Sequence, residues 1–168
     1  MENEIIKLPD GRKVAIDRSV GVVMCCYTMV DNNIYILANK RGAKTSEFKN
    51  VWNLPSGHLN WDETGEQGAI RETYEETGIQ IPLTSVFEFE HSTSPFENRQ
   101  NVIFRYVAYV PSEFLYYDFN PMDEKEVSEV LWIHEDDVDN YEWAFHHDKV
   151  IKRLLHKIHR PGGMLNIC

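Results

Sequence analysis

The sequence has few cysteines and no long apolar run. Only three of its 168 residues are cysteine, two of them adjacent (Cys25 and Cys26), and no CxxC pair occurs. This scarcity argues against a disulfide framework or a structural zinc site and favours a reducing, cytoplasmic location. No apolar run approaches the ~18 residues of a membrane-spanning helix. The N-terminus lacks the apolar core of a signal peptide, so we expect neither membrane insertion nor secretion.

Basic residues are also scarce. The 17 Lys and Arg are outnumbered by 27 Asp and Glu, which gives a formal net charge of −10. A broad basic surface for nucleic acid is therefore not expected, and on charge alone a phosphorylated substrate is unfavourable. The acids are clustered, however. Gly57–Ile79 holds six acids and one base, and residues 118–139 hold nine acids and one base.

The length and the lack of repeats or linkers predict a single domain over residues 1–168, with a short N-terminal arm (1–18) and a C-terminal tail (161–168). Apolar and alternating runs predict strands over Val20–Val30, Ile34–Ala38, Val51–Leu54, Val86–Glu90, Asn101–Val110 and Val127–Ile133. Capping signals and helical periodicity predict helices from Thr64 to near Gly78 and over Asp148–His159. This order is typical of an α/β or α+β sandwich with helices on a mixed sheet.

Three glutamates share one stripe of the first predicted helix. At ~100° per residue, Glu72, Glu75 and Glu76 fall on one side. We expect the other side to pack on the sheet through Ile70, Thr73, Tyr74 and Thr77. Like charges so close destabilise a helix, so a compensating cation is expected. Arg71 can pair with Glu75, and divalent ions can supply the rest, because hard oxygen ligands select Mg²⁺ or Mn²⁺. The alternative is a solvated acidic face.

The segment Gly57–Ile79, here called the box, reads GHLNWDETGEQGAIRETYEETGI. It resembles the signature of the Nudix hydrolase family, Gly-x5-Glu-x7-Arg-Glu-U-x-Glu-Glu-x-Gly-U, where U is a bulky apolar residue. Seven specified positions match, and at ~7% usage for each residue type a chance match is on the order of 10⁻⁸ per window. Thr73 departs from the pattern, since the family prefers an aliphatic residue there. We expect it to pack rather than react.

The resemblance implies a Nudix-type α/β/α sandwich: a mixed β-sheet with the box helix on one side and a C-terminal helix. It also implies a metal site, in which Glu75 and Glu76 are ligands and the carbonyl of Ser56 or Gly57 completes the first shell. Glu72 is the general base or a further ligand, and these alternatives stay open. We expect Gly57 to be needed for backbone shape, since glycine takes positive φ without penalty.

Two further roles follow from the resemblance. Arg71 and Glu63 would form an ion pair that fixes the loop and aims the glutamates. A fourth carboxylate often comes from outside the helix in this family, and Glu126 is the candidate. The alternative for Glu126 is a solvated loop residue among other acids.

Four residues are candidates for substrate binding. Arg41 follows a predicted strand and could reach phosphates, or it is a solvated strand end. His58 follows the box glycine and could lie near phosphates. Trp143 and Phe145 precede the last helix and could stack on a nucleobase, or they pack in the core. The neighbouring His146 and His147 could also donate to phosphate, but adjacent histidines at a helix start are more often on the surface.

The resemblance implies hydrolysis of a nucleoside diphosphate linked to another group, with Mg²⁺ as cofactor and Mn²⁺ as a substitute. The expected partner is a small nucleotide derivative such as a nucleotide, nucleotide sugar or dinucleotide. Nucleic acid is not expected except as a capped RNA end, which would make the chain an RNA-cap hydrolase. Another alternative is a regulatory Nudix module without turnover, although such modules usually lose box glutamates that this chain keeps. The oligomeric state stays open, with a homodimer as one alternative, since dimers are the commonest assembly of soluble proteins.

Overall fold

The computed structural model describes residues 4–16, 19–93 and 101–160. Its centre is a mixed sheet in the order β5-β4-β3-β8-β7, with β6 paired to β3 and β9 paired to β4. The only parallel pair among these strands is β3 with β8. The strands are β3 (Val20–Val30), β4 (Asn33–Arg41), β5 (Trp52–Asn53), β6 (Ser56–His58), β7 (Val86–Ser92), β8 (Val102–Tyr109) and β9 (Val127–His134).

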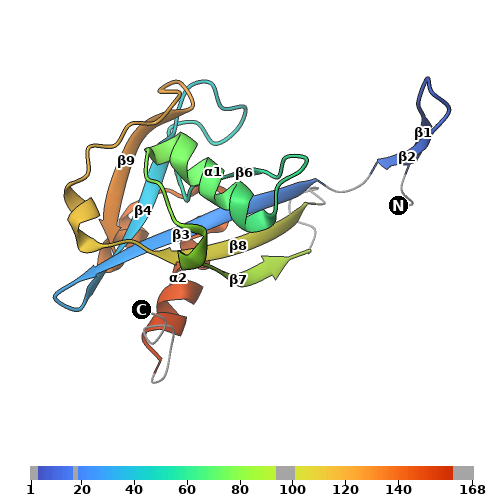
Figure 1. Cartoon of the computed structure of the whole chain (residues 1–168). Coiled ribbons are helices and arrows are strands. Elements are labelled where there is room, and N and C mark those ends of the chain that lie inside the picture. Colours follow the sequence, from blue (N-terminus) through green and yellow to red (C-terminus); the bar gives the residue numbers. More distant parts are fainter. Residues whose placement is uncertain (1–3, 17–18, 94–100, 161–168) are drawn as a thin grey trace.

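Two helices cover opposite faces of this sheet (Figure 1), as the predicted sandwich requires. Alternating residues of β3 divide between two cores. Val22, Met24 and Cys26 join Ala69 of α1 (Gly65–Thr77). Val23, Cys25 and Tyr27 join the apolar stripe of α2 (His147–Ile158), which consists of Val150, Ile151, Leu154 and Ile158. The predicted α/β/α arrangement is therefore confirmed.

Local signals set the limits of α1. The Thr64 side chain accepts from the Gln67 N–H, and the Gln67 side chain accepts from the Thr64 N–H, so the predicted capping box is present. The helix ends at Gly78, which adopts φ 79°, a left-handed conformation that glycine takes without penalty. These caps place the helix within about one residue of the prediction.

The buried side of α1 differs from the prediction. Ala69, Thr73 and Thr77 are buried as a stripe, but Tyr74 is 42% exposed. Glu76 is buried with the stripe rather than standing opposite it. The helix is therefore rotated so that the carboxylates border the sheet contact. Thr73 packs as expected, and its hydroxyl donates to the Ala69 carbonyl (2.8 Å).

Several short elements were missed. The strand predicted over Val51–Leu54 is followed by a further strand that was not predicted, β6, which begins at Ser56 and pairs with β3. The 3₁₀ helices η1 (Leu83–Ser85), η2 (Ser112–Tyr116), η3 (Glu135–Asn140) and η4 (Ala144–His146) were also not predicted. The predicted N-terminal arm contains a separate hairpin of β1 (Glu4–Lys7) and β2 (Lys13–Ile16). The predicted tail, 161–168, lies outside the described residues.

In the described part of the chain, none of the helices has both the length and the apolar character needed to cross a membrane.

Candidate active site

Arg71 ties the box loop to the box helix. Its Nε and Nη2 donate to both oxygens of Glu63 at 3.0 and 2.8 Å, which confirms the expected pair as a two-bond contact. Nη2 also donates to the His58 carbonyl (3.0 Å), and Nη1 donates to Glu72 (2.8 Å) and Glu75 (3.0 Å). Hydrogen bonding from Arg71 holds the pKa of Glu63 below its usual range, so the pair is ionised at neutral pH.

Glu72 lies directly against the backbone of Gly57. A Cβ built on Gly57 would stand 2.0 Å from Glu72 Oε1, so any side chain there would displace the carboxylate. The reason expected for this glycine was wrong, because Gly57 lies in a strand and is not among the described residues with positive φ. Glycine is needed because the carboxylate approaches the chain closely. Burial raises the pKa of Glu72.

Glu76 is buried beneath this contact, with 9% of its surface exposed. Its Oε2 accepts from the Ser56 N–H at 3.0 Å. Burial, followed by repulsion from Glu72, raises the pKa of Glu76 well above its usual value. The Ser56 N–H and the Asn39 side chain oppose that rise by hydrogen bonding to the ionised form. Burial and a neighbouring like charge therefore disfavour the ionised form of this carboxylate.

Two asparagines that the sequence reasoning missed lie behind the box. Asn39 and Asn53 face each other across β4 and β5, and both are almost fully buried. Among the described residues, neither Oδ1 atom has a hydrogen-bond partner. Asn53 Nδ2 donates to the Leu54 carbonyl and to Ser56 Oγ. The available signal was a polar residue inside an otherwise apolar strand, ILAN, at residues 36–39.

Glu126 approaches the same carboxylates from the segment before β9. Its charge contributes to the raised pKa values of both Glu72 and Glu76. Its position is fixed by the backbone, since its carbonyl accepts from the Gly42 N–H at 2.7 Å. The structure thus brings Glu126 toward the box, and its role as a ligand stays a prediction.

The oxygen atoms of this site are the kind of ligand that a hard divalent cation prefers, although they are not gathered around one point. Glu72, Glu75, Glu76 and Glu126 offer carboxylate oxygens, and the backbone of Ser56 and Gly57 lies against Glu76 and Glu72. Coordination by the carbonyl of Ser56 or Gly57 stays a prediction. Yet no group of three or more His, Cys, Asp or Glu in the described ranges is close enough to hold a metal. Glu72 and Glu75 instead pair with Arg71. Mutual repulsion of carboxylates explains this spread, and the unpartnered amide oxygens nearby show a polar, oxygen-rich site.

Arg41 and Phe145 lie together at the start of α2. The Arg41 guanidinium is 5.1 Å from the centroid of the Phe145 ring, and its Nε donates to the Glu47 carbonyl at 3.1 Å. Phe145 also meets the Phe48 ring edge-on, with centroids 4.8 Å apart. Phe145 has a left-handed backbone, with φ 54°. The two candidates therefore form one cluster, and substrate binding by them stays a prediction.

His147, expected on the surface, is buried with 3% exposure, whereas His146 is exposed. His147 Nδ1 accepts from the Leu54 N–H at 2.9 Å, so its remaining proton is on Nε2. Burial, reinforced by the charges of Arg105 and Arg41, lowers the pKa of His147 to about 3. The ring is neutral at physiological pH and holds α2 to the strand that leads into the box.

Trp143 and His58 are the other two candidates for substrate binding. Trp143 packs against the α2-side core, and its indole N–H donates to the Val138 carbonyl at 2.8 Å. These contacts favour the packing alternative. His58 has an exposed side chain on β6, and its backbone carbonyl accepts from Arg71 Nη2. Its binding role stays a prediction.

The family model described as the NUDIX domain matches residues 18–154. The m7GpppN-mRNA hydrolase dcap-2 of Caenorhabditis elegans is 36% identical over 87 residues, which cover 52% of this chain and 10% of that protein. Phosphatase NudJ of Escherichia coli is 53% identical over 36 residues, or 21% of this chain and 24% of that protein. The matches thus span a quarter or less of these curated relatives.

Two solved structures show the same fold. The NUDIX domain of Shewanella oneidensis NrtR, complexed with ADP ribose, has a TM-score of 0.70 and 23% identity, covering 89% of this chain and 92% of that one. A MutT/nudix family protein from Enterococcus faecalis also has a TM-score of 0.70, with 21% identity, covering 90% of this chain and 67% of that one.

Proposed function

This chain belongs to the Nudix family, and from that premise we propose that it hydrolyses a diphosphate linkage in a nucleoside diphosphate derivative with the help of Mg²⁺. The observation that carries the proposal is the arrangement of Glu76 and Glu72. One is buried and held by the Ser56 N–H, and the other is pressed against Gly57. A solvated acidic helix face would not bury a carboxylate beside a like charge.

The residues divide the work between binding and orientation. Arg71 and Glu63 hold the loop so that the Ser56 and Gly57 backbone stays beside the glutamates. Glu76, Glu75 and Glu126 supply oxygens for a divalent cation, with the carbonyl of Ser56 or Gly57 alongside. When bound, the cation neutralises phosphate oxygens and acidifies water.

Glu72 is either the base that accepts the proton of the attacking water or a further oxygen ligand. Its buried position supports the first role, because burial raises the pKa of a carboxylate toward the working pH of a general base. Its bond to Arg71 opposes that rise and favours the ionised form, which is the form that can accept the proton.

The substrate side of the proposal is broader. Arg41 and Phe145 offer a guanidinium and a ring at one end of the site, which suits a phosphate and a base. Two of the similar proteins suggest further substrates to test. One relative is an m7GpppN-mRNA hydrolase, and one structural neighbour holds ADP ribose. A small nucleotide derivative remains the substrate class proposed, in a cytoplasmic homodimer.

A substrate panel tests this proposal. Nucleoside triphosphates, nucleotide sugars, ADP-ribose, dinucleoside polyphosphates and capped RNA are incubated with the full chain and Mg²⁺ or Mn²⁺, and phosphate is measured after a coupled phosphatase. We expect turnover of at least one class, lost when a chelator removes the metal. A Glu76→Gln preparation purified in the same way controls for contaminating phosphatases. Turnover that survives chelation, or no turnover of any class, would contradict the proposal.

A further inference from the structure

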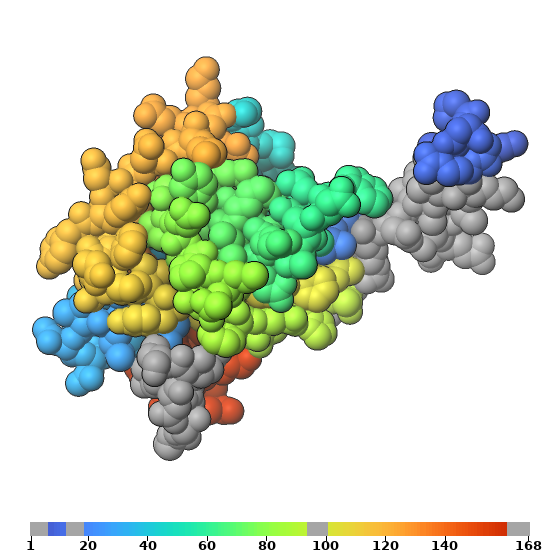
Figure 2. Space-filling view, in the orientation of Figure 1, coloured from blue at the N-terminus to red at the C-terminus, as the bar shows by residue number. Residues whose placement is uncertain are grey.

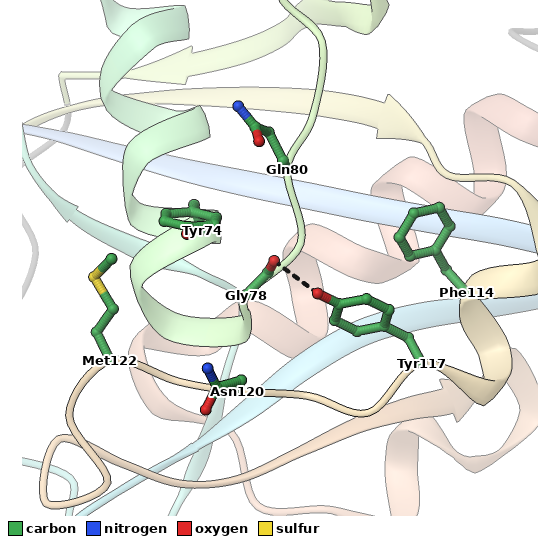
Figure 3. Close-up of a pocket in the computed structure, with 7 residues that line it drawn as sticks. All are labelled: Tyr74, Gly78, Gln80, Phe114, Tyr117, Asn120 and Met122. Carbon is green, nitrogen blue, oxygen red and sulfur yellow. Dashed lines mark hydrogen bonds between the residues drawn. The ribbon is translucent and has the colours of Figure 1, made fainter.

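A cavity of about 440 Å³ lies at the C-terminal end of α1, away from the carboxylate stripe. Tyr74, which lines it, projects about 160° around the helix from Glu72. The volume falls in the range of roughly 300–1,000 Å³ that is typical of ligand pockets. We call it the aromatic pocket, and Figure 3 shows its lining residues: Tyr74, Gly78, Gln80, Phe114, Tyr117, Asn120 and Met122.

The walls of the aromatic pocket are held by hydrogen bonds. The segment that follows η2 runs along the end of α1, where the yellow to orange chain lies against the green helix in Figure 2. The Tyr117 hydroxyl donates to the Gly78 carbonyl at 3.1 Å. The Asn120 N–H donates to the Thr77 carbonyl (3.2 Å) and the Met122 N–H to the Glu75 carbonyl (2.8 Å). The pocket is therefore a built feature of the fold.

The lining combines aromatic faces with amide oxygens. Tyr74 and Tyr117 are 42% and 38% exposed, and Tyr117 packs against Phe114 with ring centroids 5.3 Å apart. Within the described ranges, the side-chain amides of Gln80 and Asn120 make no hydrogen bond, so their oxygens are available to a donor. Ring faces attract cations, and amide oxygens accept hydrogen bonds from them.

Acidic residues outnumber basic ones around the aromatic pocket, and Asp123, which adjoins Met122, is already paired with Lys44. Glu113, Asp118 and Glu124 are each within two residues of a lining residue. In the part of the chain that the structure describes, no Lys, Arg or His pairs with any of the three. The C-terminal end of α1 adds partial negative charge from its backbone dipoles. An anionic nucleotide is disfavoured here, and a cation is favoured.

The exposed apolar surface extends beyond the aromatic pocket. Met122 is 66% exposed, and Tyr116, which adjoins Tyr117, is 92% exposed. A small inorganic or organic cation would leave this surface uncovered, whereas an extended peptide would cover it. A planar guanidinium can stack on a tyrosine ring while donating to two amide oxygens, which a lysine ammonium cannot match.

We propose that the aromatic pocket binds an arginine side chain from a basic segment of a partner protein. The ring faces of Tyr74 and Tyr117 stack on the guanidinium, and Gln80 and Asn120 accept its N–H groups. Glu113, Asp118 and Glu124 attract the segment's remaining positive charge. This inference gives part of the acidic segment 118–139 a use, and it stands whether or not the chain is a hydrolase.

Fluorescence anisotropy with a labelled ten-residue peptide of alternating Gly and Arg tests the proposal on the full chain. Tyr74→Ala is the test variant, and Phe87→Ala in β7 is the matched control, because both rings are 42% exposed. A cation–π contact of ~1 kcal/mol corresponds to about a 5-fold change in Kd. We expect Tyr74→Ala to raise Kd at least ~5-fold and Phe87→Ala to leave it within ~2-fold.

Two further measurements keep the test decisive. A Gly-Lys peptide should bind more weakly than the Gly-Arg peptide, and a Gly-Glu peptide should not bind. In NMR titrations of the unaltered protein, the side-chain amide signals of Gln80 and Asn120 should shift with the Gly-Arg peptide. Equal binding by the Tyr74→Ala and Phe87→Ala variants, or amide signals that stay unmoved, would overturn the proposal. Displacement of the peptide from these amides by AMP would also overturn it, since the pocket would then take a nucleobase.

Discussion

Acid should destabilise the fold through His147 in particular. Its pKa falls from 6.5 to about 3 on folding, because the ring is buried and faces Arg105 and Arg41. Between pH 3 and pH 6.5 the ring is therefore protonated in the unfolded chain but neutral in the folded chain. Stability from this residue is complete above pH ~6.5 and is lost progressively as the pH falls toward 3.

The magnitude follows from linkage. At pH 5 the unfolded histidine is about 1.5 pH units below its pKa, while the folded ring is still neutral. Since one pKa unit corresponds to about 1.4 kcal/mol, His147 alone should lower the free energy of unfolding by ~2 kcal/mol between pH 7 and pH 5. Solvent screening should not reduce this free-energy change, because the ring is only 3% exposed.

Urea denaturation at pH 7 and pH 5 measures this loss. His147→Asn keeps an acceptor near the Leu54 N–H but cannot titrate, so its loss over that range should be smaller than that of the unaltered protein by ~2 kcal/mol. His91→Asn is the control, since the His91 side chain is 61% exposed. NMR should show the His147 ring untitrated at pH 5. Parallel losses in the two proteins, or a ring that titrates near pH 6.5, would refute the reasoning.

Three further predictions concern the box and the buried thiols. Gly57→Ala should lower kcat at least ~10-fold with little change in circular dichroism, because its Cβ would stand 2.0 Å from Glu72 Oε1; undiminished kcat would contradict this contact. Arg71→Lys should lower the free energy of unfolding by ~1–3 kcal/mol in urea, since a lysine cannot keep the two-bond pair with Glu63; an unchanged midpoint would contradict it. Cys25 and Cys26 are fully buried, and burial raises the pKa of both thiols. In thiol titration with a chromogenic disulfide, two of the chain's three thiols should react only after unfolding, and rapid reaction of more than one thiol in native buffer would show that Cys25 or Cys26 is accessible.

The sequence predicted the parts of the fold that local signals specify. Thr64, Gln67 and Gly78 mark the ends of α1 by capping and turn chemistry that depends on neighbours within a few residues. The α2 stripe was equally readable, because apolar residues at i, i+3 and i+4 need only one apolar partner surface. The strand centres followed from apolar runs in the same way.

The elements that the sequence did not predict depend on contacts between residues far apart in the chain. β6 exists because Gly21 lies opposite His58 and Val23 opposite Ser56 on a strand more than thirty residues away, which no local pattern records. The exposure of Tyr74 depends on the rotation of α1 against the sheet, and helical periodicity alone does not fix that rotation.

The candidate site shows the same division. Family resemblance named Arg71, Glu63 and the box glutamates. The structure brings Arg71 into contact with Glu63 and Glu75 as expected, and with Glu72 in addition. Asn39 and Asn53 were missed, because a polar residue in an apolar strand does not reveal its partners. Asn39 lies opposite Asn53 on the next strand, and its side chain hydrogen-bonds to Glu76. The need for glycine at position 57 was expected, but its cause was a side-chain approach from another element.

The most direct test of the proposed metal site compares Glu76→Gln with Glu66→Gln, two changes on the same helix. Glu66 lies in the first turn, outside the carboxylate group. With the best substrate of the panel, Glu76→Gln should lower kcat at least ~100-fold and weaken Mg²⁺ binding in calorimetry, as loss of a ligand should. Glu66→Gln should keep both within ~2-fold. If Glu76→Gln retains full turnover and Mg²⁺ affinity, Glu76 is not a metal ligand and the proposed mechanism is wrong.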